Sequence, residues 1–223
     1  MNARDRANPR LVELVRERMF AITPLGLEAI IAVPEAARGI VLFAHGSGSS
    51  RLSPRNTFVA RALHGSRIAT MLFDLLTDEE AADRRNVFDI ALLAERLVLA
   101  TGWASEREDL RELPIGYFGA STGAAAALVA AARTRSNVAA IVSRGGRPDL
   151  AGEALQHVAC PTLLIVGGAD LPTLAVNRDA FAALACEKSL KIVPRATHLF
   201  EEPGALDEVV ALARRWFERH LGR

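Results

Sequence analysis

The sequence predicts an α/β fold, in which a mostly parallel sheet of eight strands has helices on both faces and no cap domain. Short apolar runs alternate along the 223-residue chain with longer segments of helical character. The runs are apolar at almost every position, which is typical of strands that are covered on both faces. With 50% hydrophobic residues, the chain is also apolar enough to bury one sizeable core.

Eight β-type runs, each followed by turn residues, define the predicted strands. In chain order they are MFAIT, LEAIIAV, GIVLFAHG, RIATMLFD, PIGYFGAS, VAAIVSRGG, PTLLIVGGAD and LKIVPRATH. Only the stretch PLGL joins the first two runs, so we expect these two strands to form an antiparallel hairpin at one edge of the sheet.

Six helices are expected between and after the later strands. Their predicted spans are Pro54–Gly65, Arg85–Ala104, Thr122–Arg133, Leu150–His157, Pro172–Cys186 and Gly204–Leu221. We expect residues 1–18 to form an extension with a short helix, and residues 19–223 to form a single domain.

Composition argues against several classes of partner. The 27 basic and 26 acidic side chains leave a net charge of +1, so we expect no attraction to nucleic acid or to an anionic membrane surface. No apolar run approaches the roughly 18 residues needed to span a bilayer. Two cysteines, Cys160 and Cys186, are too few for a disulfide framework, which favours a reduced, cytoplasmic setting. The preference for arginine over lysine suggests a bacterial genome.

Residues suited to chemistry follow four of the predicted strands. The stretch His45-Gly46-Ser47-Gly48 follows the third strand, Ser121 the fifth, Asp170 the seventh and His198 the eighth. Because ligands of such sheets collect beyond the carboxyl ends of the strands, we expect these residues to share one site.

The pentapeptide from Gly119 to Gly123, GASTG, matches the pattern G-x-S-x-G around Ser121. This pattern indicates a nucleophile elbow only where a strand precedes the serine and a helix follows it. The apolar PIGYF before the serine and the strong helix former TGAAAALVAAAR after it satisfy both conditions. The alternative is a turn serine without chemistry.

A serine hydroxyl needs a histidine to accept its proton and a carboxylate to orient that histidine. Ser121, Asp170 and His198 supply these groups in the order serine, acid, histidine. Two alternatives stay open for the acid. Asp170 also stands where a helix N-cap is expected, and Asp149, one strand earlier, is a second candidate for the carboxylate.

Two backbone N–H groups are predicted to bind the oxyanion of the tetrahedral intermediate, those of Thr122 and Ser47. His45 and Gly46 are expected to shape the loop that contains Ser47 and are themselves candidates for substrate binding. Arg51 and Arg144 are candidates for substrate binding: each either steers an anionic substrate or pairs with a carboxylate, Asp74 or Asp149.

The stretches HGSGSSRLSPRN, FDLLT, GASTG, SRGGRPDLAG, LLIVGGAD and ATHLFEEPG resemble those of small, capless α/β-hydrolases of the dienelactone hydrolase-like group. The resemblance extends from about Phe20 to the carboxyl terminus. It implies serine-type hydrolysis of carboxylic esters, with Ser121 as nucleophile, Asp170 as acid and His198 as base. Dienelactone hydrolases proper have cysteine at the elbow, so specificity for cyclic lactones does not follow from the resemblance. Similar domains also occur fused behind phosphoribosyltransferase domains.

We therefore expect a serine carboxylesterase whose partner is a small ester, without a metal ion or an organic cofactor. Only residues 143–161 separate the sixth and seventh predicted strands, enough for one short helix, so we expect an open site without a lid. A thioesterase, lactonase or small-peptide hydrolase with the same triad, and an inactive binding module, are the alternatives.

Overall fold

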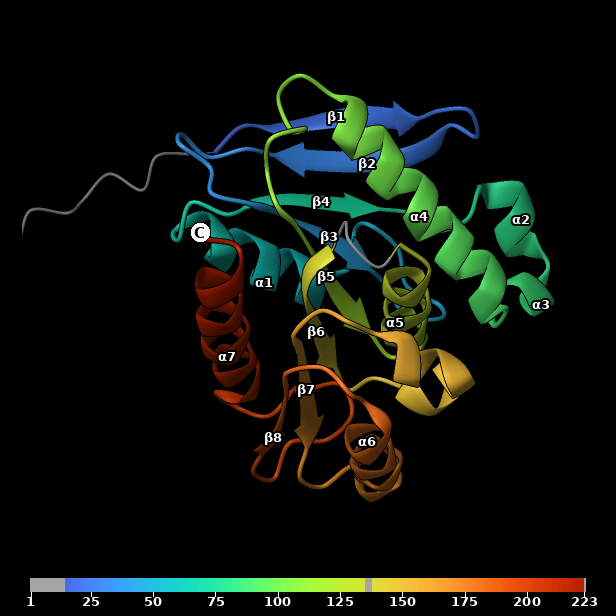
Figure 1. Cartoon of the computed structure of the whole chain (residues 1–223), viewed down its shortest axis with the longest axis vertical. Helices are drawn as coiled ribbons and strands as arrows, with labels where there is room; N and C mark the ends of the chain where they lie inside the picture. Colours follow the sequence, from blue (N-terminus) through green and yellow to red (C-terminus); the bar gives the residue numbers. More distant parts are fainter. Residues whose placement is uncertain (1–14, 135–137, 223) are drawn as a thin grey trace, which may run out of the picture.

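A computed structural model describes residues 15–134 and 138–222 of the chain. An eight-stranded sheet runs through it in the order β1-β2-β4-β3-β5-β6-β7-β8 (Figure 1). The strands are β1 (Glu17–Ile22), β2 (Leu27–Ala32), β3 (Ile40–Ala44), β4 (Ala69–Phe73), β5 (Ile115–Ala120), β6 (Val138–Arg144), β7 (Thr162–Gly167) and β8 (Lys188–Val193). Each strand coincides with one of the eight predicted runs, which confirms the predicted architecture.

The predicted hairpin is confirmed, since β1 and β2 pair antiparallel at one edge of the sheet. β2 also pairs antiparallel with β4, whereas the remaining neighbours pair in parallel. β1 begins at Glu17, ahead of the predicted domain start at residue 19. Residues 1–14 of the predicted extension lie outside the described residues.

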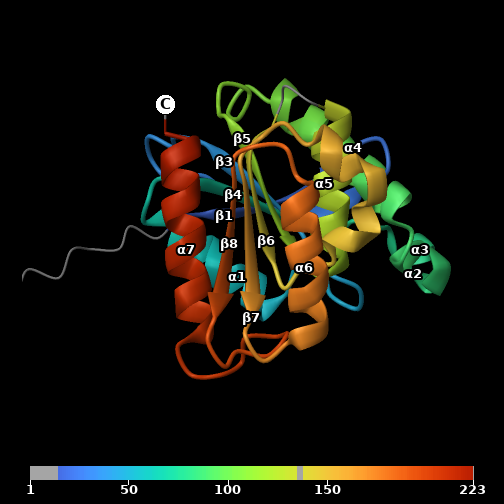
Figure 2. The same ribbon diagram turned by 60° about the horizontal axis from the view of Figure 1, so that its bottom comes forward.

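Helices cover both faces of the sheet. The helical elements are α1 (Pro54–His64), α2 (Asp78–Ala82), α3 (Arg84–Val87), α4 (Ile90–Glu106), α5 (Thr122–Thr134), the 3₁₀ segment η1 (Pro148–His157), α6 (Leu171–Ala183) and α7 (Ala205–His220). Figure 2 shows α1 and α7 on one side of the sheet and α4, α5 and α6 on the other. No helix in the described parts of the chain combines the length and the apolar character needed to cross a bilayer.

The predicted helix Arg85–Ala104 is wrong at its beginning, because capping side chains divide this region. Thr77 and Glu80 form a reciprocal capping box that begins α2. The side chain of Asp89 then accepts a hydrogen bond from the N–H of Leu92 at 3.0 Å and begins α4 five residues later than predicted. Each cap satisfies backbone donors that a helix start leaves unpaired, so two short helices precede the long one.

Two further elements differ from the prediction. The expected helix Leu150–His157 is a 3₁₀ segment that begins at Pro148 and is interrupted at Gly152, where φ is +54°. The helix expected to end at Cys186 ends at Ala183, because the next residue is already extended. The connection between β6 and β7 therefore holds one short helical segment and no inserted lid, as predicted.

The sheet is the centre of the core. Every residue of β3, β4, β5 and β7 is buried, as expected of strands that are covered on both sides. On the side of α1 and α7, the rings of Phe43 and Phe118 pack with their centroids 5.0 Å apart. Phe43 and Phe118 lie near the carboxyl ends of β3 and β5, the end of the sheet at which the candidate site is expected.

Candidate active site

Ser121 lies at a sharp turn between β5 and α5, as predicted for a nucleophile elbow. Its φ is +51°, a backbone conformation that non-glycine residues rarely adopt and that costs about 1–3 kcal/mol. The turn also needs Gly123, because a β-carbon there would lie 2.2 Å from the carbonyl oxygen of Ala44. The glycine allows α5 to pack close to β3, and the turn raises Ser121 above the end of the sheet.

Asp170 and His198 are joined by a hydrogen bond of 2.7 Å between Asp170 Oδ2 and His198 Nδ1. Asp170 follows β7 and His198 follows β8, two neighbouring parallel strands. The other carboxylate oxygen of Asp170 accepts from the N–H of Thr173, so the N-cap role considered for this residue is also present. Burial works against its charged form, but the hydrogen bonds from Thr173 and His198 outweigh burial and lower the pKa of Asp170.

The second candidate for the acid, Asp149, is engaged elsewhere. Its carboxylate accepts three hydrogen bonds of 2.8, 3.2 and 2.6 Å from the guanidinium of Arg147, at the first turn of η1. The carboxylate that contacts the imidazole is therefore Asp170 and not Asp149, which favours Asp170 as the acid; its catalytic role stays a prediction.

Ser121 and His198 both contact the dipeptide that ends β6 and begins the next loop. The N–H of Ser121 donates to the carbonyl oxygen of Arg144 at 3.3 Å. A β-carbon at Gly145 would lie 3.6 Å from Cε1 of His198. In the described parts of the chain, no hydrogen bond joins Ser121 to His198. Catalytic hydrogen bonds are often formed only when substrate is bound, so this geometry is compatible with a triad.

The two predicted oxyanion donors, Ser47 and Thr122, contact each other. The N–H of Ser47 donates to Oγ1 of Thr122 at 2.9 Å. An oxyanion at this place would have to replace the threonine hydroxyl as the acceptor. Thr122 is the first residue of α5, where backbone N–H groups have no acceptor within the helix. The role of both N–H groups as oxyanion donors therefore stays a prediction.

His45 and Gly46 lie in the loop after β3. The Nε2 atom of His45 accepts from the N–H of Leu75 at 3.1 Å, so Nδ1 has the proton and donates to the carbonyl oxygen of Gly46 at 3.0 Å. Burial lowers the pKa of His45 and favours this neutral form. A β-carbon at Gly46 would lie 3.0 Å from Cβ of Ser121. The structure thus supports the predicted role of His45 in shaping the loop.

The two candidate arginines differ. Arg51 pairs with Asp74, and its Nη2 lies 2.5 Å from Oε2 of Glu28. The structure therefore shows Arg51 paired with two carboxylates and not as a free charge. Arg144 forms no ion pair with Asp149 or with any other carboxylate of residues 15–134 and 138–222. It is 7% exposed, and burial together with nearby Arg55 lowers its pKa to about 10, so it remains charged at neutral pH.

Two residues that the sequence did not single out contact His198 or the loop next to it. Gly145 packs against His198, and Asn177 of α6 is fully buried and bonded to the loop after β6. Gly145 belongs to the glycine pair of SRGG, which could have marked a close approach of the backbone. A lone asparagine inside a helical stretch offers no such signal.

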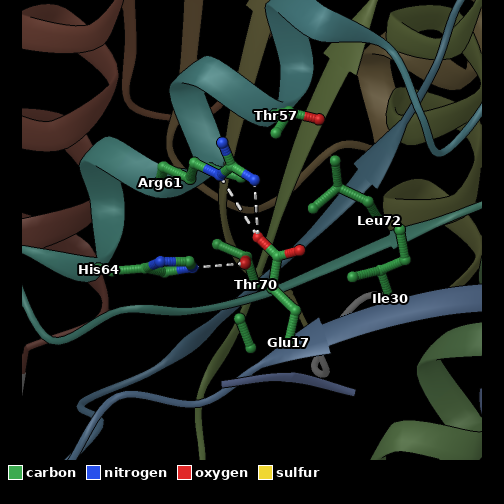
Figure 3. A pocket seen from close by; sticks show the side chains of 9 residues that line it. Glu17, Ile30, Thr57, Arg61, His64, Thr70 and Leu72 are labelled. Carbon is green, nitrogen blue, oxygen red and sulfur yellow. Dashed lines mark hydrogen bonds and ion pairs between the residues drawn. The ribbon is translucent and has the colours of Figure 1, made fainter. Parts of the chain in front are cut away.

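A small cavity of about 20 Å³ lies beside α1 and the edge hairpin, lined by side chains that include Glu17, Arg61, His64 and Thr70 (Figure 3). Arg61 pairs with Glu17 at 3.3 Å, and Nε2 of His64 lies 2.8 Å from Oγ1 of Thr70. Its volume is about that of one water molecule, and no residue of the predicted triad lines it. The cavity is therefore no substrate site.

Comparison with solved structures identifies a close match. A dienelactone hydrolase from Anabaena variabilis is 54% identical, with a TM-score of 0.90, over 92% of this chain and 98% of that chain. The protein XC6422 from Xanthomonas campestris, described as an α/β serine hydrolase without a lid, is 21% identical, with a TM-score of 0.73, over 95% of this chain and 97% of that chain. At this lower identity, the likeness shows the fold alone.

Among curated proteins, two sequences of Mycobacterium tuberculosis, provisionally named phosphoribosyl transferases, are 59% identical over 198 residues. The match covers 89% of this chain but only 45% of each relative, so the chain spans about half of their length. No family model matches the chain.

Proposed function

We propose that this chain, which belongs to the dienelactone hydrolase family of α/β-hydrolases, is a serine carboxylesterase that cleaves small or short-chain carboxylic esters. The family supports the coarser statement that the chain is a hydrolase. The observation that supports the finer one is the 2.7 Å hydrogen bond between Asp170 and His198, together with a serine at a nucleophile elbow after β5.

In the first proposed step, His198 acts as a general base. Because Nδ1 of His198 donates its proton to the Asp170 carboxylate, Nε2 has a free lone pair. Nε2 takes the proton of Ser121 Oγ while this oxygen attacks the ester carbonyl. The negative charge on the carbonyl oxygen is proposed to lie against the N–H groups of Thr122 and Ser47.

In the second step, the imidazolium of His198 returns the proton to the leaving alkoxide, and the acyl group stays on Ser121. A water molecule then attacks the acyl-enzyme, again with His198 as the base, and releases the carboxylic acid. Asp170 stabilises the imidazolium in both steps. No step of this proposed reaction requires a metal ion or an organic cofactor.

The proposed substrates are small because nothing is inserted over the strand ends between β6 and β7 except η1. A site without a lid suits short-chain esters and requires no activation at a lipid interface. We propose a small-molecule ester as the partner, and neither nucleic acid nor a membrane surface. The name of the mycobacterial relatives does not describe this chain by itself, because the chain corresponds to 45% of their length.

Labelling by a fluorophosphonate probe tests the proposal directly. We expect the wild-type chain to be labelled and Ser121→Ala to be unlabelled, with Ser105→Ala as a control because the Ser105 hydroxyl donates to the carbonyl oxygen of Thr101 within α4. Hydrolysis of nitrophenyl esters of graded acyl length should be fastest for short chains. Faster cleavage of thioesters, lactones or peptides would indicate one of the related activities, and a folded wild type without labelling would indicate a binding module.

A further inference from the structure

We propose that Asn177 is a positioning residue for the triad, whose buried amide ties the loop after β6 to the first turn of α6. This inference rests on the proposed function, because it concerns the placement of Asp170, His198 and Ser121. Asn177 lies outside the set of residues expected from the sequence to act in catalysis, and no hydrogen bond within residues 15–134 and 138–222 joins its side chain to those of the triad.

The amide of Asn177 is completely enclosed. Its exposed fraction is 0%, and Nδ2 donates to the carbonyl oxygens of Gly146 at 2.9 Å and Thr173 at 2.8 Å. Since both acceptors are carbonyl oxygens, the nitrogen and not the oxygen of the amide must face them. The bond to Thr173 stays within α6 and holds the side chain in one orientation. The bond to Gly146 joins two separate elements.

At one end, this link reaches the acid. Thr173, whose carbonyl oxygen accepts from Asn177, donates its own N–H to Oδ1 of Asp170 at 3.4 Å. The other carboxylate oxygen accepts from His198. The first turn of α6 therefore orients the carboxylate, and Asn177 holds that turn.

At the other end, the link reaches the nucleophile and the base. Gly146 stands between two residues that contact them. Gly145 packs against His198, and the N–H of Arg147 donates to the carbonyl oxygen of Ser121 at 3.1 Å. A shift of this loop relative to α6 would therefore move the supports of all three triad segments relative to one another.

The chemistry of the side chain matters as well as its size. A carboxylate at this position would place an oxygen against two carbonyl oxygens, and an apolar side chain would leave the buried carbonyl of Gly146 unpaired. A serine in a helix interior bonds to the carbonyl four residues earlier, here that of Thr173. Asn177→Ser would therefore keep the bond within α6 and lose the bond to Gly146.

The test compares Asn177→Ser and Asn177→Asp with Thr101→Val. Thr101 is a matched control because its buried hydroxyl bonds to Leu97 and Tyr117, away from the site. With nitrophenyl acetate, we expect kcat to fall about tenfold to a hundredfold in the Asn177 variants while KM changes little. The low-field NMR resonance of the His198 Nδ1 proton, assigned through its loss in Asp170→Asn, should shift or broaden.

Wild-type kcat and an unchanged low-field resonance in Asn177→Ser would overturn the inference, as would an equal loss of kcat in Thr101→Val at equal loss of thermal stability. If Asn177→Asp does not fold, Asn177→Ser alone decides. Failure of the proposed function is distinguishable. In that case the wild type neither cleaves esters nor reacts with the probe, whereas the NMR resonance still reports whether Asn177 holds the contact of Asp170 with His198.

Discussion

The guanidinium carbon of Arg144 lies 5.9 Å from the centroid of the Phe200 ring, two residues beyond His198 along the chain. This cation sits at the carboxyl end of β6, next to the turn that contains Ser121. Across the described residues, 15–134 and 138–222, no carboxylate neutralises it. A buried charge without a partner is costly, and a substrate anion is one way to satisfy it.

Substitution of Arg144 by alanine should therefore affect carboxylated esters more than neutral ones. A charge-assisted hydrogen bond contributes about 1.5–3 kcal/mol, so we expect an additional loss in kcat/KM of roughly tenfold to a hundredfold for the carboxylated ester. The measurement compares both esters in Arg144→Ala and in Arg147→Ala, whose arginine pairs with Asp149 at the surface. Equal losses for the two esters would end the idea that Arg144 binds a substrate anion.

The choice of acid predicts a large difference between two aspartates. Asp170→Asn should lower kcat by about 10³- to 10⁴-fold, because the amide no longer stabilises the imidazolium of His198. Asp149→Asn should lower it less than about twofold, since it loses only a partly exposed pair with Arg147. Steady-state kinetics of both variants measure this difference. A larger fall in kcat in Asp149→Asn than in Asp170→Asn would contradict the choice of Asp170 as the acid.

Gly145 should be intolerant of a side chain. A β-carbon at Gly145 would lie 3.1 Å from the carbonyl oxygen of His198 and 3.3 Å from Cε2 of Phe200, so Gly145→Ala should displace the histidine loop. We expect a fall in kcat of about tenfold or more, measured beside Gly152→Ala. Gly152 also has a positive φ, +54° against +51°, but nothing lies within 4 Å of its β-carbon position, so Gly152→Ala reports backbone strain alone. Similar kcat values for the two variants would contradict the packing argument.

His45 should make stability depend on pH. Burial lowers its pKa, although the bond to Gly46 and the charge of Asp74 act in the opposite direction. Between the ordinary histidine value of about 6.5 and the lowered value, the unfolded chain binds the proton and the folded chain does not, so stability decreases as pH falls below about 6.5.

The measurement is the thermal unfolding midpoint at pH 7 and pH 5. His45→Gln, which keeps an acceptor for the N–H of Leu75, should reduce the pH dependence, whereas His157→Gln at an exposed position should leave it unchanged. Because burial also lowers the pKa of His64, part of the dependence should remain in His45→Gln. An unchanged dependence in His45→Gln would show that the pKa of His45 is the same in the folded and the unfolded chain, which would contradict the prediction.

Much of the fold was predictable because its signals are local. The central strands β3, β4, β5 and β7 are short, mostly apolar runs, and α5 is rich in alanine, so both can be recognised from neighbouring residues. The short helices α2 and α3 were missed because a capping box at Thr77 and an N-cap at Asp83 decided where each of them begins. A helix cap depends on a single side chain, and a search for periodic apolar residues does not detect it.

The sequence by itself determined the order of the strands along the chain, the elbow at Ser121 and the small set of polar residues at the strand ends, because these follow from short-range chemistry. The tertiary structure alone decided which carboxylate meets His198, which arginine is neutralised and where Asn177 donates. Those pairings join segments that lie tens of residues apart, and their geometry depends on how helices pack on the sheet. Residue types at a distance in sequence do not specify that packing.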